Sequence, residues 1–450
     1  MPASPHLHLP SSIRAGLALA ILLPGPLLAS GFAVQDQSAG SIALGHAGAA
    51  SADSAAVALQ NPAMATGFDR SSTSVNLGGI SLSADFQNAG SLNAIGLPVA
   101  MPATAAADGA APLLSLFHTR RLSERLHFTF SMHTPFGLAT DYDPDWVGRY
   151  QLTTAELATL ALNPSLAWKV SDTISLAAGL RAVHAKSKLA SAVDFGTLCL
   201  VAIDPTSCAG AQIGPGSHDG HATIEADDWG YGFNLALAVR ASDRTRWGLT
   251  WRSKVDLDLD GDAQFDNPTL PGPFAGLTMT PLTTDGDARS DITLPESLTA
   301  SLYHDLSGST ALVADYTHTR WSRLHALVVS FANGAPDKVV PFNWKDTHKL
   351  AVGLMHELDD RWQLRGGLEW ESSAVDDAER NPVVPDSRRL FAGIGARFRL
   401  ASGGSVDFGL GRLRFARGGI DYTLPGAGTL RGRYALDSWH VGIQYNRGFN

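Results

Sequence analysis

The chain has two cysteines, Cys199 and Cys208, in the short stretch CLVAIDPTSC. Two thiols this close in sequence could form a disulfide, remain free, or contribute to a metal site. An even number of cysteines in an exported chain predicts one local disulfide. A pair of free thiols is the alternative interpretation, and two isolated cysteines make a poor metal site.

An acidic run, DLDLDGD, spans residues 256–262 and imitates the start of a calcium-binding loop. Position twelve of such a loop would be Asn267 rather than a glutamate, and Leu257 and Leu259 alternate with the acids as in a strand. We therefore predict a polar strand face here. His221 and Glu225 form a weak metal pair, which we also assign to a strand, so no metal site is expected.

Catalytic motifs are missing from the sequence. The fifteen histidines are scattered, and we find no Gly-x-Ser-x-Gly, no His-Glu-x-x-His and no phosphate-binding glycine loop. The net charge of −9 argues against a nucleic-acid partner. We expect neither an enzyme nor a protein with a cofactor.

Five basic residues could instead bind the carboxylate head group of a hydrophobic ligand. They are Lys186, Lys188, Arg252, Lys338 and Lys345. The alternative for each is a solvated charge on a polar strand face, and the sequence leaves both interpretations open.

Residues 1–30 are predicted to be a signal peptide. Arg14 precedes an apolar run from Ala15 to Leu23, and small residues follow up to Ser30. A transmembrane helix needs roughly 20 apolar residues, so this run is too short to remain as an anchor. The pattern predicts cleavage near Ser30 and export of the mature chain.

Residues 31–70 form a distinct segment that is rich in alanine, glycine and serine. Such a segment has too little bulk to build a core and too many polar residues to span a bilayer. It ends close to Asn61-Pro62-Ala63, a sequence that also favours an ordinary turn.

The rest of the chain, residues 71–450, alternates with the period of two that is typical of strands. In WGLTWRSKVDLDLDG, residues 247, 249, 251, 255, 257 and 259 are apolar and fall on one face, opposite Arg252, Lys254 and the aspartates. Only 17% of residues are charged, against roughly 25% in soluble domains. Apolar faces that end in aromatic residues suit a lipid-exposed band, and the polar faces suit a wet lumen.

The connections between these strands are short on one side and long on the other. Short polar turns are expected at 119–125, 169–173, 240–246, 304–309, 356–361 and 399–405. Longer loops are expected at 87–111, 138–148, 191–219, 266–287, 332–342, 376–385 and 419–429. Thirteen connections predict fourteen antiparallel strands closed into an all-β transmembrane barrel, with both termini periplasmic.

Thr134-Pro135-Phe136-Gly137 interrupts one of the predicted strands. Proline cannot donate to a strand ladder and glycine weakens a strand, so these residues predict a bulge or kink in the wall. The alternative is that they end the strand before a loop.

At this point the chain resembles the FadL-type outer-membrane transporters of long-chain fatty acids and, in some members, aromatic hydrocarbons. The resemblance covers residues 31–450 and rests on GFAVQDQSAGSIALGHAGAASADSAAVALQNPA (31–63), TPFGLATDY, TWRSKVDLDLDG, TLPESLTASLY, THTRWSRL and NWKDTHKLAVG. It implies that residues 31–70 are a hatch inside the barrel lumen, with Phe32, Asn61, Pro62 and Ala63 in its gate motif. It also implies ligand capture at the outer face and sideways exit at the kink, residues 134–137. Basic residues expected from the resemblance are replaced here by Ser191 and Val340, which leaves room for a neutral aromatic ligand.

These observations predict a monomeric transporter in the outer membrane of a Gram-negative cell, surrounded by lipid. It would take up hydrophobic small molecules passively, with long-chain fatty acids as the first candidates and aromatic hydrocarbons as the alternative. A lipid-acting outer-membrane enzyme and a general porin are the competing hypotheses from other classes.

Overall fold

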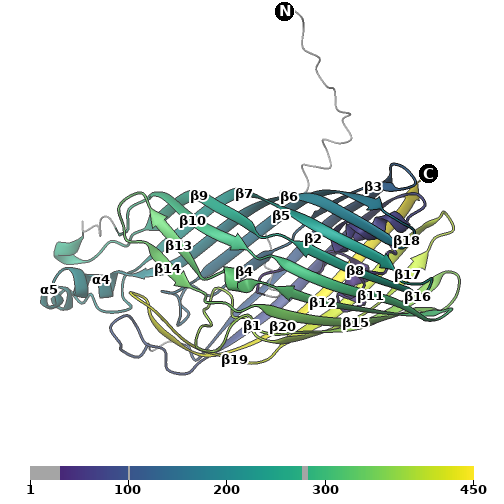
Figure 1. The fold of residues 1–450 in the computed structure, drawn as a ribbon. Helices are drawn as coiled ribbons and strands as arrows, with labels where there is room; N and C mark the ends of the chain where they lie inside the picture. The colour runs from purple at the N-terminus through teal and green to yellow at the C-terminus, as the bar shows by residue number, and fades with distance from the viewer. Residues whose placement is uncertain (1–30, 100–101, 276–281, 450) are drawn as a thin grey trace, which may run out of the picture.

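The computed structural model describes residues 31–99, 102–275 and 282–449, which form a closed antiparallel barrel (Figure 1). Its strands, in order around the wall, are β1 (Ser71–Asn88), β2 (Thr104–Arg121), β3 with β4 (Leu126–His133, Gly137–Asp141), β5 (Thr154–Lys169), β6 (Ile174–Asp194), β7 (Asp219–Arg240), β8 with β9 (Thr245–Arg252, Val255–Asp266), β11 with β10 (Ser297–Ser307, Gly286–Leu294), β12 with β13 (Thr310–Thr319, Ala326–Phe331), β15 with β14 (Thr347–Glu357, Lys338–Pro341), β16 (Trp362–Glu371), β17 (Arg389–Arg399), β18 with β19 (Gly404–Phe415, Gly418–Leu424) and β20 (Gly428–Phe449). Where two segments share one strand of the wall, the ladder is interrupted between them.

Fourteen wall strands are present, as predicted from the turn count. The barrel closes because β1 pairs with β20 along its whole length, from Ser71 opposite Phe449 to Asn88 opposite Gly432. Several loop predictions were too long. Residues 104–111 already belong to β2, and most of 419–429 forms β19, which pairs with β20. The predicted loops 138–148 and 332–342 likewise contain residues of β4 and β14.

The two ends of the barrel differ (Figure 1). Short turns and Phe449, the last residue that the structure describes, lie at one end, which we call the lower end. The other end, the upper end, carries α4 (Phe195–Ala202) and α5 (Pro205–Gly210). A disulfide between Cys199 and Cys208 joins these two helices, as predicted. None of the helices in the described residues is long and apolar enough to cross a membrane.

The lower half of the barrel has an apolar exterior and a polar interior. Exposed residues on its outer face include Leu166, Trp168, Leu180, Tyr231, Phe233, Trp247, Leu368, Ile394 and Ile443. Buried residues on its inner face include Asn76, Ser131, Asn163, Asn234, Asp315, Arg365, Glu369, Asp407 and Gln444. This is the alternation of a membrane barrel, and it places a lipid-exposed band around the lower half.

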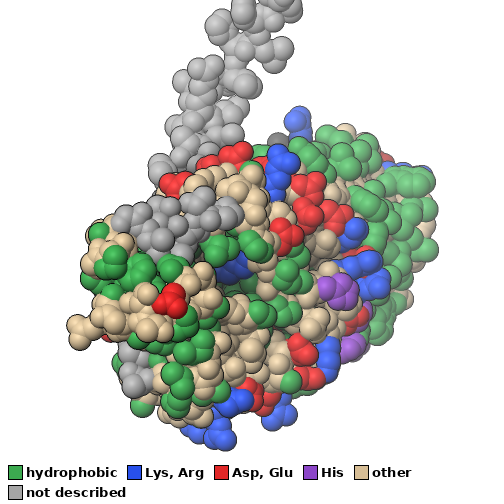
Figure 2. Space-filling model, turned by 90° about the vertical axis from the view of Figure 1, so that its left-hand side faces the viewer, with side chains coloured by type: hydrophobic (Ala, Val, Ile, Leu, Met, Phe, Trp, Pro, Cys, Tyr) green, Lys and Arg blue, Asp and Glu red, His purple; other side chains and the backbone are tan. Residues whose placement is uncertain are grey.

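The upper half is arranged the other way round, so the expectation that the polar strand faces line the lumen was wrong for this part of the wall. In β9, Val255, Leu257 and Leu259 are buried inside, whereas the aspartates of the acidic run are exposed outside. Figure 2, which looks onto the upper end, shows acidic and basic side chains on this part of the surface.

A one-residue bulge explains the exchange of faces between β8 and β9. Asn234 of β7 pairs with Arg252 of β8, but Asp227 pairs with Asp260, so residues 228–233 oppose residues 253–259. One strand therefore has one residue more than its neighbour. Because side chains alternate between faces, the extra residue moves every later side chain to the opposite face.

The hatch, residues 31–70, lies inside the lower half of the barrel. It contains α2 (Ala39–Ala43), α3 (Val57–Gln60) and a 3-10 helix, η1 (Pro62–Gly67). Wall glycines permit its close approach: a Cβ added at Gly367 would lie 2.0 Å from the carbonyl oxygen of Leu44, and one at Gly393 would lie 1.9 Å from that of Ile42. The predicted signal peptide, residues 1–30, lies outside the described residues, and the division into leader, hatch and barrel stays a prediction.

Candidate functional site

The third wall strand is interrupted where the sequence predicted a kink. Thr134, Pro135 and Phe136 separate β3 from β4. The ladder between β2 and β3 ends at Leu116 opposite Met132, and β4 pairs only with β5. Within the described residues, no ladder joins β4 to residues 104–115 of β2. We call this unpaired part of the wall the wall gap.

The first residues of the hatch cover the kink from inside. Ala33 forms an antiparallel bridge with Phe136. The amide of Val34 donates to the carbonyl oxygen of Pro135 at 2.9 Å. The hatch therefore supplies the hydrogen bonds that β2 does not make at this level.

The side chain of Gln37 also bonds the hatch to the kink. Its Nε2 donates to the carbonyl oxygen of Thr134 at 2.6 Å, and its Oε1 accepts from the amide of Thr134 at 3.2 Å. The Oε1 also accepts from Ser115 of β2 at 2.9 Å. One hatch side chain thus bonds to both strands that border the wall gap.

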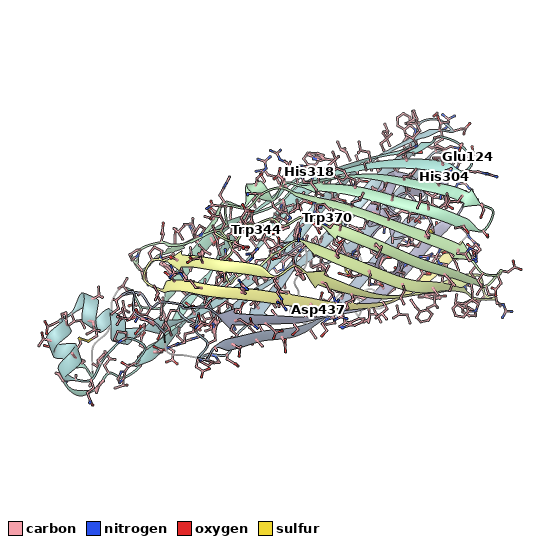
Figure 3. All side chains as sticks on the ribbon, turned by 90° about the horizontal axis from the view of Figure 1, so that it is seen from below. Glu124, His304, His318, Trp344, Trp370 and Asp437 are labelled. Atoms are coloured by element: carbon pink, nitrogen blue, oxygen red, sulfur yellow. A yellow bond between two sulfur atoms is a disulfide. The ribbon has the colours of Figure 1, made fainter. Side chains whose placement is uncertain are left out.

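An aromatic cluster lies above this contact. The ring centroid of Phe32 is 4.8 Å from that of Trp321 and 5.8 Å from those of Phe136 and Trp344. Trp321 belongs to η3 (Trp321–Arg323), in the break between β12 and β13. The carbonyl oxygen of Phe32 accepts from the amide of Gly137 at 2.7 Å, which links the ring cluster to the kink. In Figure 3, Trp344 lies towards the middle of the long axis, whereas Glu124 marks the lower end.

Above the cluster is an apolar cavity, the upper pocket, with Phe32 among its lining residues. The other lining residues are Leu138, Glu156, Leu157, Ser187, Leu189, Ile224, Ala226, Leu259, Ala288, Arg289, Ser290, Ile292, Leu327, Val329, Phe342, Val383 and Val384. The strands whose faces are exchanged supply several of these side chains. A largely apolar pocket with few polar groups is the usual form of a site for a hydrophobic ligand.

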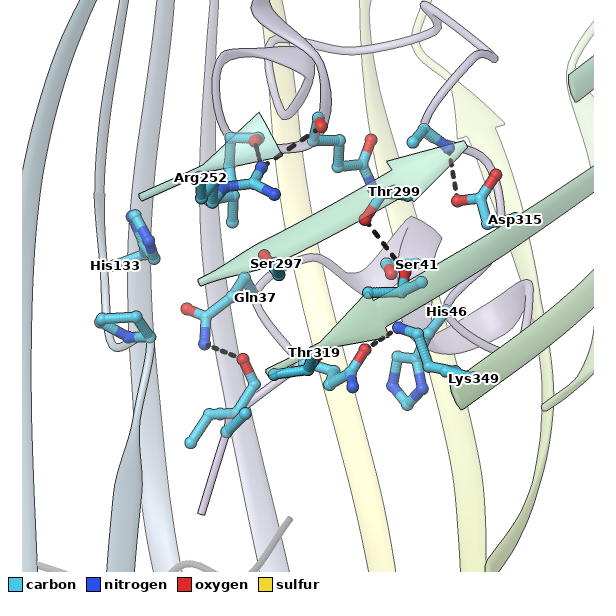
Figure 4. A pocket seen from close by; sticks show the side chains of 18 of the residues that line it. Gln37, Ser41, His46, His133, Arg252, Ser297, Thr299, Asp315, Thr319 and Lys349 are labelled. Carbon is cyan, nitrogen blue, oxygen red and sulfur yellow. Dashed lines mark hydrogen bonds between the residues drawn. The ribbon is translucent and has the colours of Figure 1, made fainter. Parts of the chain in front are cut away.

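Below the cluster is a second cavity of about 190 Å³, the lower cavity (Figure 4). Hatch residues Ala33–Gln35, Gln37 and His46 form part of its wall, and Phe136 of the kink lines it too. Figure 4 shows Arg252 and His133 on one side of it, and Asp315 and Lys349 on the other. The hatch segment from Phe32 to Gln37 therefore lies between the two cavities.

Asn61, Pro62 and Ala63 lie at the other end of the hatch from Phe32. The side chain of Asn61 accepts from the amide of Ala63 at 3.1 Å and donates to the carbonyl oxygen of Leu237 at 3.1 Å. Pro62 occupies the first position of η1, where its missing N–H costs nothing. These residues fasten the hatch to β7; their role in gating stays a prediction.

Two of the five basic residues proposed as head-group ligands face outward. Lys186 and Lys188 of β6 project from the outer surface and lie near Glu225, with Nζ–Oε distances of 3.8 and 3.2 Å. Neither is among the residues that line the two cavities.

The other three lie in different places. Lys345 is exposed and forms an ion pair with Asp376. Lys338 of β14 is partly buried, and its Nζ donates to Ser191 Oγ at 3.2 Å. Arg252 lines the lower cavity, where it donates to the carbonyl oxygens of Leu59 and Gln60 at the end of α3. No group of three or more potential metal ligands occurs among the described residues.

Buried charges that the sequence did not single out hold the hatch against the lower wall. His46 Nδ1 lies 2.9 Å from Glu369 and its Nε2 lies 3.0 Å from Asp36, which also lies 2.8 Å from His440. Burial would lower the pKa of His46, but the two carboxylates outweigh it and raise that pKa to about 9. A buried group that carries a charge needs such partners.

A second ion-pair group fastens the middle of the hatch. Asp53 pairs with Arg365 at 2.6 Å and lies 3.4 Å from Arg397, which pairs with Asp407 at 2.6 Å. In the sequence Asp53 is one polar residue of a small-residue segment, and an ion pair across about 300 residues leaves no local signal there.

The chain is similar to known proteins over nearly its whole length. The family described as "Outer membrane protein transport protein (OMPP1/FadL/TodX)" matches residues 21–449. A long-chain fatty acid transport protein of Escherichia coli O6:H1 is 26% identical over 455 residues, which cover 97% of this chain and 98% of that protein.

Solved structures share the fold. A Pseudomonas aeruginosa FadL homologue superposes with a TM-score of 0.83 at 20% identity, over 93% of this chain and 100% of that one. The Pseudomonas putida toluene transporter TodX superposes with a TM-score of 0.69 at 17% identity, over 92% and 99%.

Proposed function

Because the chain belongs to the outer membrane protein transport protein family (OMPP1/FadL/TodX), whose members are transport channels and not enzymes, we propose that it takes up long-chain fatty acids by moving its hatch and releasing them sideways through the wall gap. The chain is an outer-membrane transporter of hydrophobic compounds. The relative from Escherichia coli, named as a long-chain fatty acid transport protein, supports the choice of substrate.

One observation carries the mechanism: the hatch segment that ends the upper pocket is the segment that covers the wall gap. Phe32 lines the upper pocket, and the next residues bond to the kink. A movement of residues 32–37 would open the floor of the pocket and uncover the gap at once.

The physical reason for this route is that an acyl chain gains about 0.8 kcal/mol for each methylene kept out of water. A water-filled pore offers none of this stabilisation, whereas the upper pocket and the surrounding lipid both do. The flow needs no energy source beyond removal of the ligand on the inner side. In this proposal the short-turn end, where the last strand ends, faces the periplasm.

Aromatic hydrocarbons are the second candidate substrate. Ser191 and Val340 occupy positions where the family resemblance leads us to expect basic residues, and a neutral ligand needs no such cation. The fold similarity to a toluene transporter is compatible with this candidate but does not favour it, because it concerns the fold alone.

The hatch movement can be tested with a disulfide that holds the hatch on the kink. Ala33 and Phe136 are direct partners in an antiparallel bridge, a geometry in which Cα atoms lie about 4.5–5.5 Å apart, within the range of a disulfide. The variant Ala33→Cys/Phe136→Cys, reconstituted in liposomes, should take up oleate when reduced and at least tenfold more slowly when oxidised.

Each single-cysteine variant is the matched control, since it carries one of the substitutions but cannot form the lock. The native protein treated with the same reductant controls for opening of the Cys199–Cys208 disulfide. Equal uptake by the oxidised and reduced double variant would refute the hatch movement.

A further inference from the structure

We propose that the lower cavity is a second, anion-binding subsite, in which Arg181 and Arg252 receive the carboxylate of the ligand after the hatch has moved. This inference rests on the proposed function and sharpens it: the transported molecule is a carboxylic acid rather than a neutral hydrocarbon. The site lies apart from the upper pocket and from Lys338.

The two arginines come from neighbouring parts of the wall. Arg181 of β6 is only 4% exposed, and its Nη1 donates to the carbonyl oxygen of Ser253 at 3.2 Å. Within the described part of the chain, Arg252 of β8 donates only to hatch carbonyl oxygens. Both side chains line the lower cavity.

Neither guanidinium group has a carboxylate partner among the described residues. Asp315 is the only acid among the described residues that line the cavity, and it accepts from the amide of Ala49 instead. The buried arginines of the lower wall that hold the hatch behave differently, because Arg365 and Arg397 each pair with aspartates. A buried Arg181 and a half-buried Arg252 that bond to neutral carbonyls leave a positive potential that no carboxylate pairs with directly.

His133 adds an unused polar group to the same side of the cavity. It is 2% exposed, it lines the cavity, and its Nδ1 has no hydrogen-bond partner among the residues that the structure describes. Figure 4 shows its ring beside Arg252, across the cavity from Thr319 and Lys349. A carboxylate between these groups would satisfy donors that the protein itself leaves without an anion.

The lower cavity also lies on the proposed path of the ligand, between the hatch and the kink. Phe136 of the kink and Ala33 to Gln35 of the hatch form one of its walls, so a ligand that passes Phe32 enters it directly. The acyl chain can lie against Pro135 and Phe136, at the border of the wall gap, while the carboxylate stays with the arginines. Head and tail would then be held in the orientation in which the tail enters the lipid first.

The test compares one pair of ligands that differ only in the head group, dodecanoate and dodecanol, at saturating concentration in liposomes. Arg181→Met should slow dodecanoate uptake roughly ten- to hundredfold, the range for a lost charge-assisted hydrogen bond, and change dodecanol uptake less than twofold. Lys186→Met removes one positive charge from the outer face of the same strand and is the matched control, with no change for either ligand.

Equal loss for acid and alcohol would mean that Arg181 only shapes the route, and would overturn the subsite while leaving the transporter intact. If the native protein moves neither ligand, the proposed function itself fails. Should Arg181→Met not fold, crystals of the native protein soaked in bromide decide the matter: an anomalous peak within hydrogen-bond distance of both guanidinium groups supports the site, and its absence refutes it.

Discussion

Lys338 donates to Ser191 and so brings a cation beside one of the two positions where the family resemblance leads us to expect basic charges. Ser191 is buried, and Lys338 is partly buried. A positive charge is therefore present close to the expected position, although a different residue carries it. This favours a carboxylate over a hydrocarbon as the first ligand of the upper half.

Replacing Lys338 by methionine should weaken binding of dodecanoate roughly tenfold and leave binding of dodecanol unchanged, because only the acid gains from the charge. Lys345→Met is the control, since Lys345 is exposed and already paired with Asp376. Tryptophan fluorescence titration of the detergent-solubilised protein would measure both. Equal affinities of the native protein and the Lys338 variant for dodecanoate would exclude Lys338 as a head-group ligand.

At the residue scale, the sequence identifies basic candidates but not whether their side chains project into the lumen or outward. Lys186 and Lys188 lie in a strand with clear alternation, yet they face outward above the lipid-exposed band and pair with Glu225. Arg181 was not singled out at all, because it is one arginine in an apolar strand. Its significance comes from Arg252 and His133, which are distant in sequence and adjacent only in the folded wall.

At the scale of elements, the hatch is held to the wall by charges as well as by shape. His46 bonds to Asp36 of the hatch and to Glu369 of β16. Lys349, His440 and Arg389 are further charged or titratable groups beside these carboxylates. Since the pKa of His46 is raised from 6.5 to about 9, the protonated form stabilises the docked hatch.

The raised pKa of His46 determines how the stability of the docked hatch depends on pH. The stabilisation is complete below pH 6.5 and is lost as the pH rises through about 9. We expect amide exchange in residues 39–47, corrected for its intrinsic pH dependence, to accelerate between pH 7 and pH 10. His46→Gln should remove most of this change. An equal acceleration in the variant would mean that other groups hold the hatch.

The exchange of faces is the part of the wall that sequence reasoning could not foresee. From Trp247 to Leu259 the apolar residues keep the same odd-numbered parity, so the sequence predicts one continuous face. A single extra residue near Ser253 is invisible in that pattern, because it depends on pairing with β7. The strand number, by contrast, follows from turns, which are local signals.

On the scale of the whole molecule, the barrel and the hatch make separate contributions. The ladder from Ser71 to Phe449 closes without any hatch residue, whereas the hatch fills the lower lumen. Deleting residues 31–63 should therefore leave a folded barrel that migrates differently on gels before and after heating. It should also abolish selective oleate uptake and raise ion conductance in planar bilayers above that of the native protein.

The disulfide-bonded helices α4 and α5 lie far from the hatch, so reducing Cys199–Cys208 in the deletion variant provides a control for loop effects on conductance. Low conductance in the folded deletion variant would mean that the hatch is not the plug of this channel.

The bulge near Ser253 marks the level at which the apolar side of the wall changes. Above that level the apolar side of the wall faces inward, and below it the apolar side faces the bilayer. Residues at four of the strand breaks, Phe136, Arg252, Pro295 and Thr319, line one cavity, so the crossing occurs at a single level. To a molecule that avoids water, the inside of the upper barrel and the membrane around the lower barrel are similar environments, and in the proposed mechanism the wall gap would join them once the hatch has moved.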